Sequence, residues 1–368
     1  MTVAHVRFRL VSIALGVSFA IFLGEVGLRM FPSYTPIAMD IFQTGSDGEL
    51  RLTPGVRRQH ASPEWNVAVD INAQGFRDAE GAPPPGAVLA VGDSMTFGWG
   101  VAETEAFPQR LEHTRGTRVA NAGIPATGPV DQLGLLKELL PRWHPKTVLL
   151  GFWVGNDFQD EAEGGASGKE VVDGLLFTRG TRTASSILVG WVKRRSYVAQ
   201  LAAQGLWLLQ RRRAEVTPVE NRASPGLDAR NADLRAFVAI HLTGELPGDL
   251  AAGVTRTYRD LDAMRELCRE NGARFVLVVL PRSVQVHDED RRRYERAYDI
   301  APGQWDMDRP QRLLAAWANG KSDVELIDTL PALRAAAGSG RLFFFPDSHM
   351  NARGHSVVAE EIARRLRP

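Results

Sequence analysis

Short runs of strand-forming residues alternate along this chain with segments of helical spacing, and this alternation constrains the fold more than any other feature. The runs are Val88–Val91, Arg118–Ala122, Thr147–Val154, Phe275–Leu280 and Val324–Ile327. Apolar residues at helical spacing mark Thr104–His113, Pro129–Leu140, Val254–Asn271 and Ser356–Leu366. Strands separated by helices build one parallel sheet with helices on both faces. We therefore predict an α/β fold, a three-layer α/β/α sandwich around a five-stranded, doubly wound parallel sheet.

Two local features refine this prediction. We expect Thr104 to be the N-cap of its helix, and Pro108 lies early enough in that helix to be tolerated. The first run ends in Gly92-Asp93-Ser94, which places a serine where a buried strand stops. Ligands of open α/β sheets bind outside the carboxyl ends of the strands. The alternative is that Gly92-Asp93-Ser94 only caps the following helix.

The N-terminus predicts a membrane segment. Arg7 and Arg9 precede the uncharged apolar stretch Leu10–Gly24, which is shorter than the roughly 20 residues of a typical span. Long basic side chains reach the membrane surface from inside it, so Val6–Phe31 is long enough to cross. We expect residues 1–31 to form an uncleaved anchor, with a cleavable signal peptide as the alternative. The early arginines predict a cytoplasmic N-terminus and an exported body, periplasmic or extracellular.

The rest of the chain divides into an extension and a main domain. We expect residues 32–85 to form a stem and N-terminal extension, with Pro83–Gly86 as the boundary, and residues 86–368 to form the main domain. An insertion at residues 158–253 interrupts it. The insertion contains the apolar segment Ser185–Leu209, which is either a helical cap over the site or a membrane-surface helix. Beyond it, we expect Arg211–Arg213 to be solvated and Ala214–Asp233 to form a mobile loop.

Composition and motifs exclude several classes of function. The 44 basic and 43 acidic residues leave no positive excess for binding nucleic acid. A single cysteine, Cys268, rules out an intramolecular disulfide framework and a multi-cysteine zinc site. The sequence contains neither an HExxH nor a GxGxxG motif. We therefore expect no metal and no cofactor.

Acyl transfer by a serine requires a base that accepts the hydroxyl proton, a group that orients the base, and donors for the oxyanion. The chain offers Ser94 after the first strand, Gly123 after the second and Asn156 after the third. It also offers Asp347 and His349 in the loop before the last helix. The carboxyl ends of parallel strands share one edge of the sheet, so these residues are able to converge.

These blocks resemble the SGNH hydrolases, also called GDSL-type esterases and lipases. The motifs are Gly92-Asp93-Ser94, Gly123, Gly155-Asn156-Asp157 and Asp347…His349, in the family's order. Together with the N-terminal segment, the upstream Asn72…Gly75-Phe76-Arg77 resembles a bacterial membrane-anchored branch.

The resemblance implies a flavodoxin-like sheet, Ser94 as nucleophile, His349 as base and Asp347 as the residue that orients His349. It also implies an oxyanion hole made of the backbone N–H groups of Ser94 and Gly123 and the side chain of Asn156.

One feature departs from the common family pattern. A single residue, Ser348, separates Asp347 from His349 where most members have two, which resembles alginate-type acetyltransferase relatives. Asp347 could therefore be only a loop cap. His355 is a second candidate base, although packing at the start of the last helix explains it better. We assign no chemistry to Asp93 or Asp157.

The sequence thus predicts an extracytoplasmic serine esterase that hydrolyses O-acyl esters on a glycan or a lipid. The first alternative is an O-acyltransferase, for example an O-acetyltransferase, that acts on an extracytoplasmic glycan. Because a single anchor cannot carry an acyl donor across a membrane, this alternative predicts a multi-pass partner. The second alternative is an inactive glycan-binding scaffold.

Overall fold

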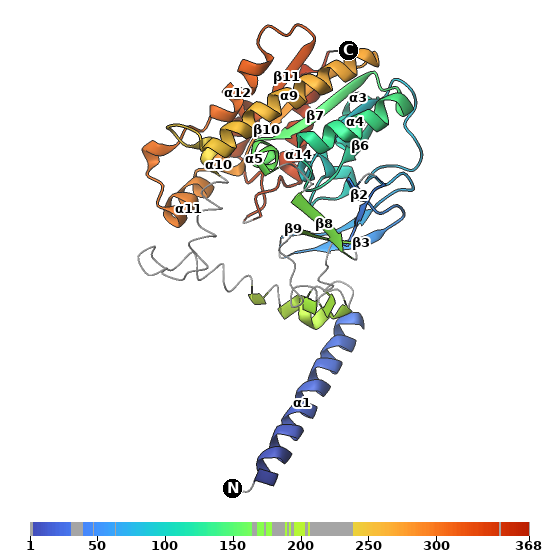
Figure 1. Cartoon of the computed structure of the whole chain (residues 1–368), viewed down its shortest axis with the longest axis vertical. Coiled ribbons are helices and arrows are strands. Elements are labelled where there is room, and N and C mark those ends of the chain that lie inside the picture. The colour runs from blue at the N-terminus through green and yellow to red at the C-terminus, as the bar shows by residue number, and fades with distance from the viewer. Residues whose placement is uncertain are drawn as a thin grey trace.

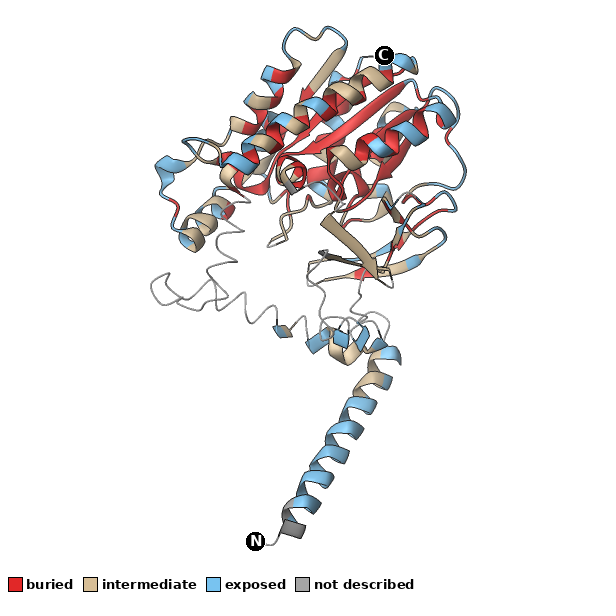
Figure 2. Ribbon diagram, viewed as in Figure 1, coloured by how far each residue is buried: buried red, intermediate tan, exposed pale blue. Residues whose placement is uncertain are grey.

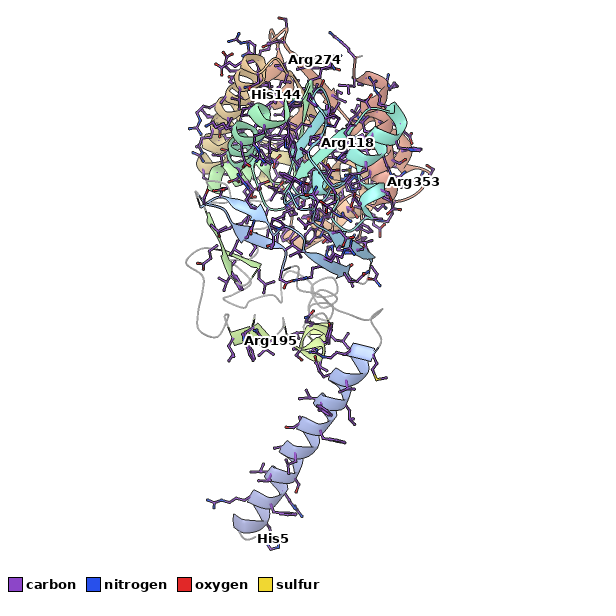
Figure 3. All side chains as sticks on the ribbon, turned by 90° about the vertical axis from the view of Figure 1, so that its right-hand side faces the viewer. His5, Arg118, His144, Arg195, Arg274 and Arg353 are labelled. Carbon is purple, nitrogen blue, oxygen red and sulfur yellow. The ribbon has the colours of Figure 1, made fainter. Side chains whose placement is uncertain are left out.

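The computed structural model of the chain describes residues 3–30, 40–46, 48–62, 64–163, 168–172, 174–178, 188–189, 191–192, 195–202, 205–206, 238–345 and 347–367. A body of sheet and helices stands apart from one long N-terminal helix, α1 (Val3–Met30), which projects away from it (Figure 1). Arg195 lies beside the C-terminal end of α1, between that helix and the body (Figure 3).

Five parallel strands form the central sheet, in the order β11-β10-β7-β5-β6. Their bounds are β5 (Val88–Gly92), β6 (Val119–Gly123), β7 (Thr147–Trp153), β10 (Arg274–Leu280) and β11 (Val324–Asp328). The predicted parallel sheet is therefore confirmed, with every strand end within one residue of its expected position. The order is flavodoxin-like: β5 lies between β6 and β7, so the direction of winding reverses at the carboxyl end of β5.

Helices cover both faces of the sheet (Figure 1). Their bounds are α2 (Ser94–Phe97), α3 (Phe107–Arg115), α4 (Pro129–Trp143), α5 (Asp157–Glu163), α9 (Gly248–Glu270), α10 (Ser283–Val286), α11 (Asp288–Tyr298), α12 (Arg309–Ala318), α13 (Leu330–Ala337) and α14 (Ala352–Arg365). Single 3₁₀ turns occur at Glu103–Glu105, Ala239–His241 and Pro302–Gln304.

The alternation of side chains along each strand divides the core into two apolar clusters. Leu89 and Val91 of β5 belong to the cluster that contains residues of α4, α9 and α12. Val88 and Ala90 belong to the cluster that contains residues of α3, α13 and α14. Because successive side chains of a strand point to opposite faces, the sheet is buried on both sides, as Figure 2 shows. The three-layer α/β/α sandwich is thus confirmed.

The start of α3 differs from the prediction. Thr104 is not an N-cap, because Glu103–Glu105 forms a 3₁₀ turn and Ala106 precedes the first residue of the helix, Phe107. The side chain of Glu105 accepts the N–H of Ala102 at 3.0 Å and closes this turn. Pro108 lies in the first turn of α3, as expected.

Three other helices extend beyond their predicted ends, among them α14, which begins at Ala352 rather than Ser356. Helix α4 continues through Pro141 to Trp143. Helix α9 begins at Gly248 rather than Val254, so its first turn lies inside the range assigned to the insertion. Gly253 explains the close packing there, since a Cβ atom on it would lie 2.5 Å from the carbonyl oxygen of Phe158.

Small hairpins lie together on the side of the sandwich that faces α1 (Figure 1). The extension forms β1 (Phe42–Thr44) with β2 (Leu50–Leu52) and β3 (Arg57–Ala61) with β4 (Asn66–Asp70), and the insertion forms β8 (Lys169–Val172) with β9 (Leu175–Thr178). The N–H of Phe42 donates to the carbonyl of Gly174 at 3.1 Å, which joins extension to insertion. The expected loop Ala214–Asp233 and the basic run Arg211–Arg213 lie outside the described residues.

Helix α1 is long and apolar enough to cross a membrane. The candidate span is Arg7–Met30, 24 residues, which contains an 18-residue window with a mean hydropathy of 2.0, and none of that window is buried against the body. A signal sequence near an N-terminus meets the same criteria of length and hydropathy, so both expectations for this segment stay open.

Candidate active site

Ser94 lies at the turn from β5 to α2. Gly92 ends the strand, where a Cβ atom would lie 2.2 Å from the hydroxyl oxygen of Thr96, so only glycine fits. Asp93 is the N-cap of α2, and its carboxylate accepts the N–H of Met95 at 2.8 Å. This turn therefore does both things that the sequence offered as alternatives: Asp93 caps the next helix, and Ser94 is placed at the end of the strand.

A chain of hydrogen bonds joins Ser94 to the C-terminal loop. The Ser94 Oγ atom lies 2.8 Å from Nε2 of His349, and Nδ1 of His349 contacts the carboxylate of Asp347. An ionised carboxylate only accepts hydrogen bonds, so Nδ1 carries the proton and Nε2 is left to accept one from the serine hydroxyl. The structure thus brings together the three residues predicted as nucleophile, base and orienting group.

The backbone of Ser348 accounts for the short spacing between Asp347 and His349. Ser348 has a φ of 75°, in the left-handed region that non-glycine residues rarely adopt. This conformation turns the backbone so that the carboxylate of Asp347 reaches the imidazole of His349. The N–H of His349 also donates to that carboxylate, at 3.3 Å.

Glu64 of the N-terminal extension hydrogen-bonds to the loop that contains Asp347 and His349. Its carboxylate accepts the backbone N–H of Phe345 and, at 3.4 Å, that of Asp347. Burial raises the pKa of Asp347, but its hydrogen bond to His349 and the charge of that imidazole outweigh burial, so the net pKa is lowered. Asp347 is therefore ionised at neutral pH.

Aromatic rings enclose the imidazole of His349. The ring of Trp153 lies 5.6 Å from it between centroids, and the ring of Trp99 lies 6.0 Å away. The ring of the buried His60 lies 4.4 Å from that of Trp99 between centroids, and burial lowers the pKa of His60 to about 3. His60 is therefore neutral, and the rings limit the positions that the imidazole of His349 can adopt.

His355 does not join this chain of hydrogen bonds. It is buried in the first turns of α14, its Nδ1 atom accepts the N–H of Phe107 at 3.2 Å, and its ring stacks on that phenyl ring. Burial lowers its pKa to about 3. The contacts are those of a packed residue between α3 and α14.

The three predicted oxyanion donors differ in their surroundings. The N–H of Ser94 is at the start of α2, where backbone N–H groups have no partner within the helix. The side chain of Asn156 donates to Asp160 at 2.7 Å and also hydrogen-bonds Asp93. The N–H of Gly123 donates to the side chain of Asn121 at 3.0 Å. Two of these donors are therefore held by neighbouring side chains.

The close approach of α2 requires a glycine at position 123. A Cβ atom there would lie 2.4 Å from the backbone nitrogen of Phe97 and 2.8 Å from the carbonyl carbon of Thr96. The packing contact alone is sufficient to exclude a side chain.

Buried carboxyl groups lie behind Ser94. Asp93 and Asp157 have no exposed surface. Burial raises the pKa of Asp93 to about 6, and burial together with the charges of Asp93 and Asp160 raises the pKa of Asp157 well above its ordinary value. Asp157 accepts the N–H of Trp153 at 2.8 Å, so it shapes the turn after β7.

Arg77 also supports the turn after Ser94. Its guanidinium is buried and donates to four carbonyl oxygens, those of Gly98 at 2.7 Å, Val101 at 2.8 Å, Ala68 at 3.0 Å and Phe97 at 3.3 Å. The sequence marked Arg77 only as part of a motif, and it gave no signal for Glu64 or for the tryptophans around His349.

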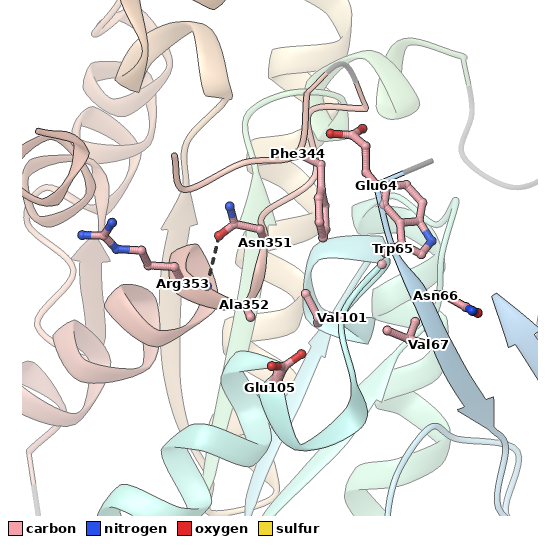
Figure 4. Close-up of a pocket in the computed structure, with 11 residues that line it drawn as sticks. Glu64, Trp65, Asn66, Val67, Val101, Glu105, Phe344, Asn351, Ala352 and Arg353 are labelled. Carbon is pink, nitrogen blue, oxygen red and sulfur yellow. Dashed lines mark hydrogen bonds between the residues drawn. The ribbon is translucent and has the colours of Figure 1, made fainter. Parts of the chain in front are cut away.

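A shallow cavity of about 390 Å³ adjoins the site (Figure 4). Trp65 and Phe344 form part of its wall, with Glu64, Glu105 and Arg353 as charged lining residues. Ser94 and His349 do not line it. Trp65 lies between the cavity and the catalytic residues, because its ring contacts both Phe344 of the cavity wall and His60.

Residues 244–368 match the family model described as "SGNH hydrolase-like domain, acetyltransferase AlgX". The matched part contains Asp347 and His349 but not Ser94. No curated protein matches the chain.

Solved structures with similar folds include a member of the lipolytic protein G-D-S-L family from Veillonella parvula DSM 2008, with 12% identity over 76% of this chain and 97% of that chain and a TM-score of 0.39. They also include the psychrotrophic esterase EstA from a Pseudoalteromonas species, with 12% identity over 76% and 96% and a TM-score of 0.39. The acetyl xylan esterase AlAXEase has 13% identity over 76% and 100% and a TM-score of 0.39. Residues 244–368 are therefore similar to an SGNH hydrolase-like domain, and the sheet of the body has the flavodoxin-like strand order.

Proposed function

We propose that the protein is a serine esterase that cleaves O-acyl esters through an acyl-enzyme on Ser94. The observation that carries this proposal is the hydrogen-bonded chain from Ser94 through His349 to Asp347. A serine hydroxyl is a weak nucleophile unless a base takes its proton, and here a correctly oriented imidazole nitrogen lies 2.8 Å away.

The reaction has two halves. The Ser94 oxygen attacks the ester carbonyl carbon while Nε2 of His349 takes the hydroxyl proton. The tetrahedral intermediate then expels the alcohol, which receives that proton. Water attacks the acyl-enzyme in the second half, again giving its proton to His349, and Ser94 is released with a free carboxylic acid. Asp347 stays ionised and holds the imidazolium that forms twice.

The oxyanion requires donors at the turn after β5. The N–H of Ser94 and the side chain of Asn156 supply them, provided that Asn156 turns from Asp160 toward the substrate. Hydrogen bonds of catalytic groups often rearrange when substrate binds. Removing one such donor typically costs about 3–4 kcal/mol of transition-state stabilisation.

A second function is O-acetyl transfer to a glycan, and the description of the matched family favours it. The acyl-enzyme is the same, but a sugar hydroxyl replaces water as the acceptor. In this case a multi-pass partner would supply the acyl donor. In both functions, we propose that α1 anchors the protein as a single span and that the body lies on the extracytoplasmic side.

The test uses the full chain in detergent micelles with p-nitrophenyl acetate as donor. We expect turnover and labelling by a fluorophosphonate in the wild type, and loss of both in Ser94→Ala. The matched control is Ser322→Ala, an exposed serine in the turn before β11, which should behave as wild type. Mass spectrometry of an added de-acetylated oligosaccharide separates the two functions, because only a transferase acetylates it. No turnover and no labelling would indicate the scaffold alternative.

A further inference from the structure

Exposed large apolar side chains are confined to two places in the described part of the chain. One is α1, and the other is a short stretch that we call the foot segment, the described residues among 188–206. Leu188, Trp191 and Leu206 of the foot segment are 60%, 48% and 57% exposed. Val189, Val192 and Leu201 are exposed as well. A soluble surface rarely gathers apolar side chains in this way, so they indicate a surface that is covered in use.

The foot segment is attached to the C-terminal end of α1 (Figures 1 and 3). The carboxylate of Glu25 accepts the hydroxyl of Ser196 at 2.9 Å and the backbone N–H groups of Tyr197 and Val198 at 3.1 and 3.2 Å. Arg29 pairs with Glu25 at 2.9 Å and donates to the carbonyl of Arg195 at 2.8 Å. These contacts fix the foot segment at one level along α1.

The foot segment contacts α1 at the point where the apolar stretch of that helix ends. Glu25 is the first charged residue after Leu10–Gly24, so it marks the depth at which an α1 that spans a membrane reaches the headgroups. A carboxylate at this depth costs free energy unless donors surround it, and the foot segment supplies three of them. The ring of Tyr197 also lies under the guanidinium of Arg29, 5.0 Å from its centroid.

The foot segment has the chemistry of the membrane interface. Trp191 and Arg195 form a cation–π pair, with the guanidinium 4.5 Å from the ring centroid. Tryptophan and tyrosine are enriched where headgroups meet hydrocarbon. The sequence adds Lys193 and Arg194 beside Arg195, and such basic residues are attracted to anionic lipids.

We propose that the foot segment lies in the headgroup region of the membrane that α1 crosses, with its apolar side chains inserted among the lipids. The proposal rests on α1 being a membrane span. Lipid is the occupant because the exposed apolar residues of the foot segment are held beside the apolar surface of α1 itself. The body is then held at the membrane by two elements, which restricts its tilt.

The test places an environment-sensitive NBD label on single cysteines of the full chain in phosphatidylcholine–phosphatidylglycerol vesicles. The variants are Leu201→Cys in the foot segment, Val17→Cys in the middle of α1, and Glu270→Cys at the exposed end of α9. The native Cys268 is buried, which raises its pKa to about 12, so it stays unlabelled. Quenching by doxyl-labelled lipid is compared with quenching by aqueous iodide.

We expect lipid to quench the labels at positions 17 and 201, a shallow doxyl group acting most strongly at 201, and iodide to quench only the label at 270. A label at 201 that iodide quenches as strongly as the one at 270 overturns the proposal while quenching at 17 preserves the span. Protection of position 201 from both quenchers would indicate a protein surface and also overturn it. Absence of lipid quenching at 17 would instead refute the span itself.

Discussion

The residue between Asp347 and His349 decides whether these two side chains meet. Ser348 has a φ of 75°, a conformation that costs a non-glycine residue about 1–2 kcal/mol. We predict that Ser348→Gly keeps the activity of the wild type and raises the free energy of unfolding by about 1 kcal/mol. Esterase assays and urea titration of the two proteins measure both quantities.

Ser348→Val provides the opposite change at the same position. A β-branched residue does not tolerate positive φ, so the loop should rearrange and move Asp347 away from the imidazole. We predict a loss of kcat of at least about 100-fold, the scale expected for a misplaced catalytic group. Equal activity of the glycine and valine variants would show that the backbone at 348 does not position Asp347.

Asp347 itself can be tested by a change that preserves shape. In Asp347→Asn, the side-chain amide presents either a donor or an uncharged acceptor to Nδ1 and no longer stabilises the imidazolium. We predict a loss of kcat on the order of 10³–10⁴-fold, as in other serine triads. A loss of less than about tenfold would support the role of a loop cap for Asp347.

The buried Asp157 predicts a pH-dependent stability. Its pKa is raised in the folded protein by burial and by the charges of Asp93 and Asp160, so between the unfolded and folded pKa values the folded state binds more protons. Stability contributed at low pH is therefore lost as pH rises through this window. Asp157→Asn removes the ionisation, and we predict that its unfolding free energy relative to wild type increases as the pH rises above about 4, the ordinary pKa of an aspartate. A pH-independent difference in urea titrations would contradict this.

At the scale of elements, Arg77 joins the N-terminal extension to the turn after Ser94. The buried guanidinium supplies donors to four carbonyls in a fixed geometry that lysine cannot reproduce. We predict that Arg77→Lys lowers the free energy of unfolding by about 2–4 kcal/mol and also lowers kcat. The matched control is Arg57→Lys, an arginine with 84% of its side chain exposed, which should change stability by less than about 0.5 kcal/mol.

The strands were predictable and several contacts between elements were not. Runs such as Phe275–Leu280 are apolar on both faces, a pattern that specifies a buried parallel strand. The start of α9 was missed because Gly248 and Asp249 lack apolar spacing. Glu64 was missed because the backbone N–H groups that it accepts, those of Phe345 and Asp347, lie far from it in the sequence. Periodicity reports the face of an element but carries no information about such distant partners.

The candidate site shows the same division. Its members could be found from short motifs at strand ends, since the parallel topology places those ends on one edge. Their hydrogen-bond states could not. The sequence contains nothing that shows Asn121 holding the N–H of Gly123 or Asp160 holding the amide of Asn156, because these partners depend on side-chain packing.

At the scale of the whole molecule, charge at the two ends of α1 determines which side of the membrane holds the body. Two arginines, Arg7 and Arg9, flank the N-terminal end, whereas Arg29 is the one basic residue at the other end before Arg51 in the sequence. Cytoplasmic flanks carry the excess of basic residues, and distant charges in a long exported domain count little. We therefore predict that the N-terminus is cytoplasmic and the body extracytoplasmic.

A membrane-impermeant maleimide tests this orientation on spheroplasts of a bacterial host. Lys137→Cys, exposed on α4, should be labelled in intact spheroplasts, and His5→Cys should be labelled only after lysis. The wild type is the control for background, because its single thiol, Cys268, is buried and its pKa is raised to about 12. The reverse pattern would place the body in the cytoplasm. Recovery of the Lys137→Cys protein as a shortened chain outside the membrane would identify the N-terminal helix as a cleaved signal, because an uncleaved anchor keeps the body with the lipid.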